Sequence, residues 1–163
     1  MSSQILPDQA KTELGLGAWM RFLRSHAAVT RELSGRLELE HGLTLSDFDV
    51  LAQLFHTPEH RLRRVDLART VLLTASGITR LLDGLERAGL VEKGSCESDA
   101  RVTYAVLTKT GEAKFLEARK GHHADIEELF SSRFDEAECA ALGELLGRLP
   151  MTEAVCTGED AAP

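Results

Sequence analysis

The stretch Thr74-Ala-Ser-Gly-Ile-Thr-Arg-Leu-Leu-Asp-Gly-Leu-Glu-Arg-Ala-Gly89 decides the fold, because it predicts a short helix with two unlike faces. Its large apolar residues recur with the 3.6-residue helical period, which places them on one side: Ile78, Leu81, Leu82 and Leu85. The opposite side carries Ser76, Thr79, Arg80 and Asp83. Thr74 can cap the first turn, and Gly89 stands where helices commonly end in a left-handed residue. We therefore expect one buried face and one face available for contact.

The outward face of this helix suits the major groove of double-stranded DNA. Small hydroxyl residues let the backbone approach closely, and Arg80 can donate to a guanine edge or to a phosphate. Many surface helices share this composition, so the neighbouring segments decide the interpretation.

The segments before the helix complete a helix-turn-helix. Arg61 to Arg63 can form a short strand, and Val65 to Val71 predicts a short helix. The inward residues of that helix are expected to be Val65, Leu67 and Ala68. Only a tight connection separates it from the next helix, and two short helices joined in this way are typical of DNA-binding proteins.

The segments after the helix predict a wing. Residues 90–93 and 101–107 have the pattern of two strands around the polar loop 94–100. The second strand alternates with Val102, Tyr104 and Val106 on one face.

Four further segments have helical patterns. Residues 1–10 are expected to be a frayed N-terminal segment. A long helix should follow from about Glu13 to Glu40, although its three glycines disfavour an unbroken helix. A second helix runs from Asp47 to His56, capped by Ser46 or Thr44. Thr57 to His60 predicts a turn. The last two helices are expected over Thr110–Phe130 and from the cap Asp135 to about Leu149, separated by a break at 131–134.

The composition points to one domain with an aliphatic core and a reducing environment. The chain has 163 residues, of which 43% are hydrophobic and only 5% aromatic. No apolar run approaches the length of a membrane span, and the first residues lack the pattern of a secretory signal. Three cysteines without paired spacing favour the cytoplasm over a disulfide scaffold.

The charge is unevenly distributed along the chain. The net charge is −7, yet residues 61–109 carry nine basic and six acidic side chains. Residues 110–163 carry five basic and twelve acidic ones. A protein meets DNA with one surface rather than with its average charge, so the basic middle is compatible with DNA binding. Ordinary fluctuation over fifty residues is the alternative explanation.

Taken in order, these segments resemble the MarR family of bacterial winged-helix transcription regulators over roughly residues 15 to 148. The matching stretches are Leu43-Thr44, Asp49-Val-Leu51, Asp66-Leu-Ala68, Ser76-Gly-Ile-Thr-Arg-Leu-Leu-Asp83, Leu85-Glu-Arg-Ala-Gly-Leu-Val91, Asp99-Ala-Arg101 and Leu107-Thr-Lys-Thr-Gly111. No single motif decides the match, but their order and spacing together are specific.

The resemblance implies a mostly α fold with an α+β wing, within a single domain over residues 1–163. Residues 43–109 would form the winged helix-turn-helix DNA-binding lobe, and 11–42 and 110–150 the helices that join two copies in a homodimer. Residues 151–163 are expected to be disordered. The implied major-groove residues are Ser76, Gly77, Thr79 and Arg80.

The resemblance also assigns the wing. Arg101 would enter the minor groove, and Asp99 would hold its side chain. The narrow minor groove of A·T-rich DNA concentrates negative potential, which attracts a guanidinium group. An exposed pair without a role in DNA binding is the alternative. The family often has arginine where this chain has Gly84 and Ala100, so its grip on phosphates or its preferred site can differ.

Many family members release DNA when a small aromatic or phenolic ligand binds. Here the candidate ligand residues are Trp19, Phe22, His26 and His56, in a cavity expected between the dimerisation helices and the DNA-binding lobe. Plain core or dimer contacts are the alternative for the two aromatic residues.

Other functions have weaker support in the sequence. Adjacent His122 and His123 point in different directions on a helix, so no metal site is expected, and His122 is interpreted as a hydrogen-bonded interface histidine. Cys96, in the presumed wing, keeps redox control open. No phosphate loop or nucleophile motif predicts an enzyme, and no cofactor is expected. A winged helix that binds only proteins is a further alternative.

The sequence thus predicts a cytoplasmic, dimeric repressor that binds a pseudo-palindromic operator in double-stranded DNA. Two-fold symmetry would place the half-sites one helical turn, roughly 34 Å, apart. A ligand that fits only a conformation with misplaced recognition helices would weaken that binding.

Overall fold

The protein is described by a computed structural model over residues 7–71, 75–95 and 102–150, with the backbone alone described at 7–10, 75, 76 and 95. The elements, in chain order, are α1 (Pro7–His41), α2 (Leu45–His56), the short 3-10 helix η1 (Pro58–His60), β1 (Arg61–Arg63), α3 (Arg64–Thr70), α4 (Ala75–Arg87), β2 (Val91–Ser95), β3 (Thr103–Leu107), α5 (Lys109–Leu129), the 3-10 helix η2 (Ser131–Arg133) and α6 (Glu136–Leu146). The predicted order of a long helix, a second helix, a winged helix-turn-helix and two closing helices is confirmed.

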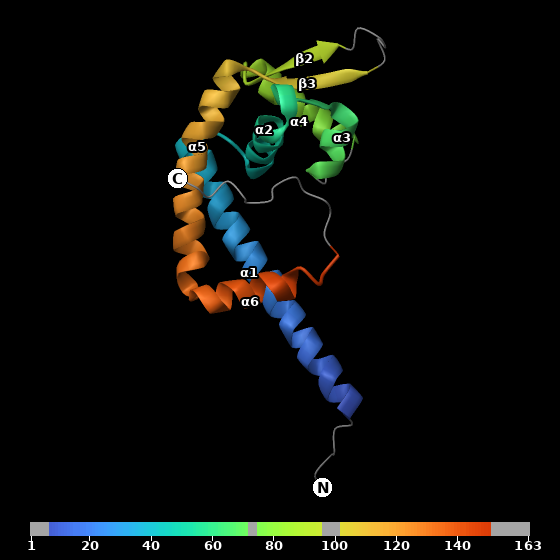
Figure 1. Ribbon diagram of the computed structural model, residues 1–163, viewed down its shortest axis with the longest axis vertical. Helices are drawn as coiled ribbons and strands as arrows, with labels where there is room; N and C mark the ends of the chain where they lie inside the picture. The colour runs from blue at the N-terminus through green and yellow to red at the C-terminus, as the bar shows by residue number, and fades with distance from the viewer. Residues whose placement is uncertain (1–6, 72–74, 96–101, 151–163) are drawn as a thin grey trace.

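The two longest helices connect a lobe at one end of the molecule to a second helical layer at the other. In Figure 1, α1 and α5 run beside each other, with α2, α3, α4 and the sheet gathered at their upper end. Helix α6, at the lower end of α5, crosses α1 near the middle of α1, and the beginning of α1 projects past it. The molecule therefore separates the lobe from the surface formed by α1 and α6.

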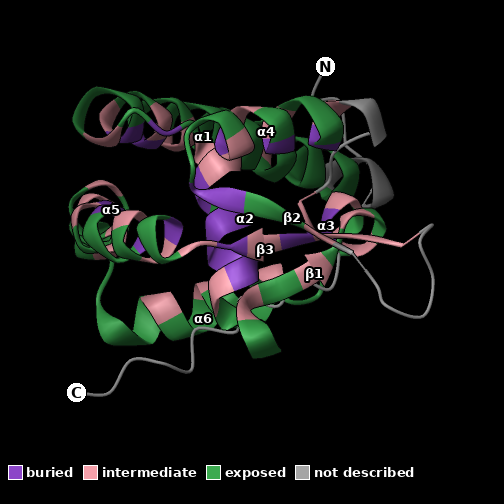
Figure 2. Ribbon diagram, turned by 90° about the horizontal axis from the view of Figure 1, so that it is seen from above, coloured by how far each residue is buried: buried purple, intermediate pink, exposed green. Residues whose placement is uncertain are grey.

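Helix α2 forms the centre of the lobe. Its residues Val50, Leu51 and Leu54 are fully buried, and the other elements surround it in Figure 2. The side chains that close this core from α3, α4 and α5 are Leu67, Leu82 and Phe115. Each large aliphatic side chain buried in this way contributes about 1.5–3 kcal/mol.

The sheet has three antiparallel strands in the order β1-β3-β2. Arg61 pairs with Val106, and the β2–β3 hairpin extends from Val91 opposite Leu107 to Ser95 opposite Thr103. The wing strands predicted from the sequence are confirmed, although β2 ends two residues later than expected.

The two faces of β3 differ in burial. Ala105 and Leu107 face the core, whereas Val102, Tyr104 and Val106 are only half-buried on the outer face. The guanidinium group of Arg61 lies 4.4 Å from the centre of the Tyr104 ring, and this cation–π contact covers part of the outer face. A strand with apolar residues on both faces gives no clear sign of its orientation.

Several helix ends differ from the predicted ones. Helix α1 begins at Pro7 rather than near Glu13, because proline is well suited to the first helical turn, where its missing N–H is not needed. It continues without a break through its three glycines. Thr44, not Ser46, caps α2: its Oγ1 accepts from the Asp47 N–H at 3.1 Å, and the Asp47 carboxylate accepts from the Thr44 N–H at 2.9 Å.

One inward position was also wrong. Val65 is 60% exposed, because α3 begins at Arg64 and turns Leu67 to the core instead. Helix α5 ends at Leu129, and Phe130 after it is exposed. The last helix ends at Leu146 instead of Leu149, while its predicted cap is confirmed: Asp135 accepts from the Glu138 N–H at 2.8 Å.

Two glycines fix the connections that position the wing. Gly89 adopts a φ of +72°, and the N–H groups of Gly89 and Leu90 bond back to the carbonyl groups of Glu86 and Leu85, so α4 ends in a Schellman turn. Gly111 packs directly on the strand entry, where a Cβ atom would lie 2.0 Å from the Leu90 carbonyl oxygen. The first turn of α5 can therefore approach the start of β2 only without a side chain.

We expect Gly111→Ala to lower the free energy of unfolding by about 3 kcal/mol or more, since the Leu90 backbone cannot move aside without disturbing the sheet. Gly84→Ala is the matched control: its Cβ meets nothing within 4 Å, and alanine in a helix should add about 0.5–1 kcal/mol. Denaturant unfolding at one protein concentration measures both. Equal stability of the two variants would contradict the close approach.

Candidate nucleic-acid interface

Helix α4 has the two faces that its sequence predicts. Ile78, Leu82 and Leu85 are buried against α2, while Thr79, Arg80 and Asp83 are exposed. Leu81 is partly buried beside the core. Gly77 lies on the same helix near its start, and the side chain of Ser76 and the whole of Thr74 fall outside the described residues. The outward face is thus available along most of the helix.

The basic side chains of the lobe differ in whether a carboxylate neutralises them. Arg61, Arg63 and Lys93 each pair with an acidic side chain, namely Glu59 at 3.4 Å, Asp66 at 3.8 Å and Glu86 at 2.9 Å. Within the described part of the chain, neither Arg69 on α3 nor Arg80 on α4 forms a salt bridge, and both are exposed. These two guanidinium groups can accept an anion without first breaking an ion pair.

An ion-pair network joins the two helices of the helix-turn-helix to the wing. Arg64 at the start of α3 lies 3.8 Å from Asp83 and 4.0 Å from Glu86 on α4. Glu86 also pairs with Lys93 on β2. The sequence gives no sign of this network, because its members lie on three elements.

The tip of the wing cannot be compared with its prediction. Strands β2 and β3 end at the paired residues Ser95 and Thr103. The expected minor-groove residue Arg101, its partner Asp99 and the candidate redox residue Cys96 lie outside the described residues.

The half-buried Cys139 on α6 has a free thiol.

Aromatic packing joins α5 to the lobe. The Phe48 ring of α2 lies 5.3 Å from the Phe115 ring and 4.6 Å from the His122 ring, measured between ring centres. The interpretation of His122 as a hydrogen-bonded interface residue was wrong: it packs inside its own chain, and its buried Nδ1 has no hydrogen-bond partner among the described atoms. Burial, and secondarily the neighbouring His123, lower the pKa of His122 below its usual value.

A cluster of charges fixes α1 against α5. The Arg36 guanidinium donates to Glu128 at 2.9 and 3.0 Å, to Asp125 at 2.7 Å and to Glu32 at 3.1 Å. The hydrogen bonds to the Glu128 carboxylate lower the pKa of that group below its usual value. This cluster joins the two long helices that carry the lobe.

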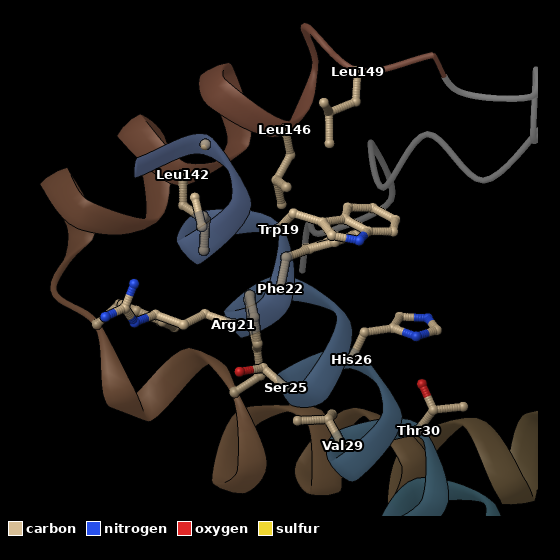
Figure 3. A pocket seen from close by; sticks show the side chains of 14 residues that line it. Trp19, Arg21, Phe22, Ser25, His26, Val29, Thr30, Leu142, Leu146 and Leu149 are labelled. Atoms are coloured by element: carbon tan, nitrogen blue, oxygen red, sulfur yellow. The ribbon is translucent and has the colours of Figure 1, made fainter. Parts of the chain in front are cut away.

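A cavity of about 710 Å³ lies between α1 and α6, and Figure 3 shows its lining. Trp19, Phe22 and His26 of α1 line it, together with Phe130, Phe134, Leu142 and Leu146. His56 is separate: its ring packs on Phe55 and Phe115 in the lobe. The structure therefore brings together three of the four candidate ligand residues, in a cavity beside α6 rather than beside the lobe.

The described part of the chain holds neither a metal-binding cluster nor a membrane span. No group of three His, Cys, Asp or Glu side chains there is placed to hold a metal ion. None of the helices within the described residues has the length and apolar character needed to cross a membrane.

The lobe and its network define a winged helix-turn-helix protein. Residues 41–102 match the sequence profile of the MarR family. The chain is 34% identical over 111 residues to the HTH-type transcriptional repressor YetL of Bacillus subtilis, covering 66% of each protein. It is 28% identical over 138 residues to the HTH-type transcriptional regulator MhqR of the same organism, covering 85% of this chain and 92% of that protein.

The fold agrees with a solved structure of the same class. A mutant MarR from E. coli, crystallised with operator DNA, has a TM-score of 0.71 and 25% identity, covering 85% of this chain and 96% of that one. The chain belongs to the MarR family. It is a transcriptional regulator of the winged-helix type, and the relatives it matches are regulators rather than enzymes.

We expect the free energy of unfolding to decrease as the pH is lowered, and to decrease more steeply than it would without His122. Because the folded state lowers the pKa of His122, the unfolded chain binds the proton more readily once the pH falls below about 6.5. Above that pH the imidazole is neutral in both states and contributes no pH dependence. His122→Leu should therefore lose less stability than the wild type between pH 7.5 and 5.

The exposed neighbour supplies the control. His123→Leu should retain most of the wild-type pH dependence, and thermal unfolding at each pH measures all three proteins. If His122→Leu and His123→Leu respond identically to pH, burial of the His122 imidazole does not control acid stability.

Proposed function

We propose that this regulator is a cytoplasmic repressor that binds, as a homodimer, a pseudo-palindromic operator in double-stranded DNA. The observation that carries the proposal is the outward face of α4, where Arg80 is exposed and has no carboxylate partner in the described residues. A helix with a buried apolar face and a free cation on the other is what major-groove docking requires.

The proposed contacts follow the geometry of the helix. The first residues of a recognition helix lie nearest the base edges, so Ser76, Gly77 and Thr79 would form the close approach and Arg80 would bind a guanine edge or a phosphate. Arg69, on the outward face of α3, is positioned on the helix that crosses the phosphate backbone in helix-turn-helix proteins.

The wing would add a contact in the minor groove. The β2–β3 hairpin is paired as far as Ser95 and Thr103, which supports a rigid base for the segment that contains Asp99 and Arg101. Arg101 would occupy a narrow A·T-rich groove, and Asp99 would orient it before DNA binds.

The dimer would form through residues 11–42 and 110–150. Apolar side chains that a monomer normally buries are exposed along α1 and on α6, outside the cavity: Leu16, Met20, Leu23 and Leu145. A second copy of the chain would cover them and place two α4 helices in successive major grooves, roughly 34 Å apart.

We expect Arg80→Ala to weaken operator binding by about 1–3 kcal/mol and to relax the base preference at one position of each half-site. The measurement titrates protein onto the DNA upstream of its own gene at several salt concentrations. The control is Arg31→Ala, which removes the same charge from the exposed side of α1. Two protomers per site and a steep salt dependence are expected of the wild type.

The same titration tests the wing. Arg101→Ala should lose most affinity on operators with A·T-rich flanks, because those flanks have the narrowest minor groove. An equal loss on all flanks would contradict the minor-groove role. Weak binding by the wild type that responds to neither salt nor sequence would overturn the DNA-binding proposal and favour a protein partner.

The cavity between α1 and α6 favours a second proposal, that a small aromatic or phenolic ligand controls DNA binding. Its lining is mostly apolar and aromatic, and its polar side chains are Arg21, Ser25, His26 and Thr30. Such a mixture suits a flat ring with one polar substituent. A ligand that preferred a state with displaced α4 helices would release the operator.

Trp19 is the only tryptophan of the chain, so its fluorescence reports directly on the cavity. We expect 4-chlorophenol to change this fluorescence saturably. His26→Ala should shift the titration to higher ligand concentration, whereas His56→Ala should not, because His56 lies outside the cavity. A fluorescence change with equal midpoints in both variants would place the ligand elsewhere.

A further inference from the structure

Glu86 occupies a central place in the lobe that the sequence analysis did not assign. One of its oxygen atoms, Oε2, lies 2.9 Å from Lys93 Nζ on β2, and the other, Oε1, lies 4.0 Å from Arg64 Nη2 on α3. The Glu86 side chain is only 20% exposed, so solvent screens these pairs less than it screens ordinary surface pairs. A single carboxylate thus contacts the two elements on either side of the recognition helix.

Arg64 strengthens the connection on the side of α3. Its Nη2 is buried, has no hydrogen-bond partner in the described structure, and lies between Glu86 and Asp83 at ion-pair distance. Asp83 and Glu86 are three positions apart, so both project from the same side of α4. This nitrogen is therefore held by the charge of α4 rather than by a hydrogen bond.

The apolar core alone leaves the orientation of α4 incompletely fixed. Ile78, Leu82 and Leu85 contact the core through aliphatic surfaces, which are non-directional and permit a small roll of the helix. A roll would displace Arg80 relative to the base edges and would change the distance between α4 and β2. Ion pairs to both neighbours oppose the roll, since the charged atoms must stay within a few ångströms.

We propose that Glu86 is a positioning residue for DNA recognition, which sets the angle between the recognition helix and the wing through Lys93 and Arg64. The inference rests on the proposed operator binding. Glu86 touches no DNA in this scheme: it fixes where the major-groove and minor-groove contacts of one lobe stand relative to each other.

The sign of the effect distinguishes this role from simple electrostatics. Glu86 is a negative charge in a lobe that meets phosphates, so removing it should strengthen DNA binding if charge alone mattered. If Glu86 instead positions the recognition helix, removing its charge should weaken DNA binding. Glu92, exposed on β2 beside Lys93 and without a salt bridge to any described residue, offers a matched charge for comparison.

The experiment compares Glu86→Gln with Glu92→Gln in titrations of the full chain onto the operator. We expect Glu86→Gln to bind about five- to tenfold more weakly than the wild type. Glu92→Gln should bind equally or more tightly. Equal or tighter binding by Glu86→Gln would overturn the inference, whereas failure of the wild type itself to bind would overturn the proposed function.

A second readout separates positioning from a loss of folded protein. Destabilisation reduces the affinity for every operator by the same factor, so the ratio of affinities for A·T-rich and G·C-rich flanks stays constant. We expect Glu86→Gln to lower that ratio, because the wing is no longer held at one angle to α4. An unchanged ratio would assign Glu86 to stability alone.

The pairing with Lys93 is tested by a double-mutant cycle. Glu86→Gln and Lys93→Gln each remove the 2.9 Å ion pair, so the loss of affinity in the double variant should be smaller than the sum of the two single losses. Additive losses would show that the two residues act independently and would overturn the proposed connection to the wing.

Discussion

The burial of α2 is the constraint on which the rest of the structure depends. Val50, Leu51 and Leu54 are closed off from solvent by side chains from α3, α4, α5 and the sheet, so each of these elements is placed by its contact with one helix. One face of α4 points to solvent because the opposite face packs in the core around α2. The aromatic contact of Phe48 with Phe115 then fixes α5 relative to the lobe. The hydrogen bonds of Arg36 in turn fix α1 relative to α5.

Periodicity predicted the elements that bury a single face. The spacing of Ile78, Leu82 and Leu85 identified the recognition helix, and Gly89 located its end, because only a residue that accepts a positive φ can close a Schellman turn there. Prediction failed where an element was short. Val65 lies on α3, which has barely two turns, and it was predicted to face inward although it is exposed.

The candidate site was predictable only where it lies on one element. Thr79 and Arg80 follow from the pattern of a single helix, and the structure leaves both exposed. The network of Arg64, Glu86 and Lys93 has no sequence signature, because its distances depend on how three elements pack. How the elements pack also explains why the sequence grouped His56 with Trp19. Both residues lie beside apolar residues on helices. However, His56 belongs to α2 in the lobe core, whereas Trp19 belongs to the part of α1 that borders α6.

The distribution of charge gives this acidic protein one face suited to DNA. Most cations of the lobe are neutralised by a neighbour, and the described exceptions, Arg69, Arg80 and Arg87, lie on the two helices of the helix-turn-helix. Residues 110–163, with twelve acidic and five basic side chains, repel phosphates from the rest of the molecule. In the proposed mode of binding, attraction by the unpaired arginines and repulsion by the acidic part of the chain would orient the lobe before contact. A net charge of −7 therefore favours docking in one orientation and disfavours non-specific adhesion, which fits a protein that must select one site among many.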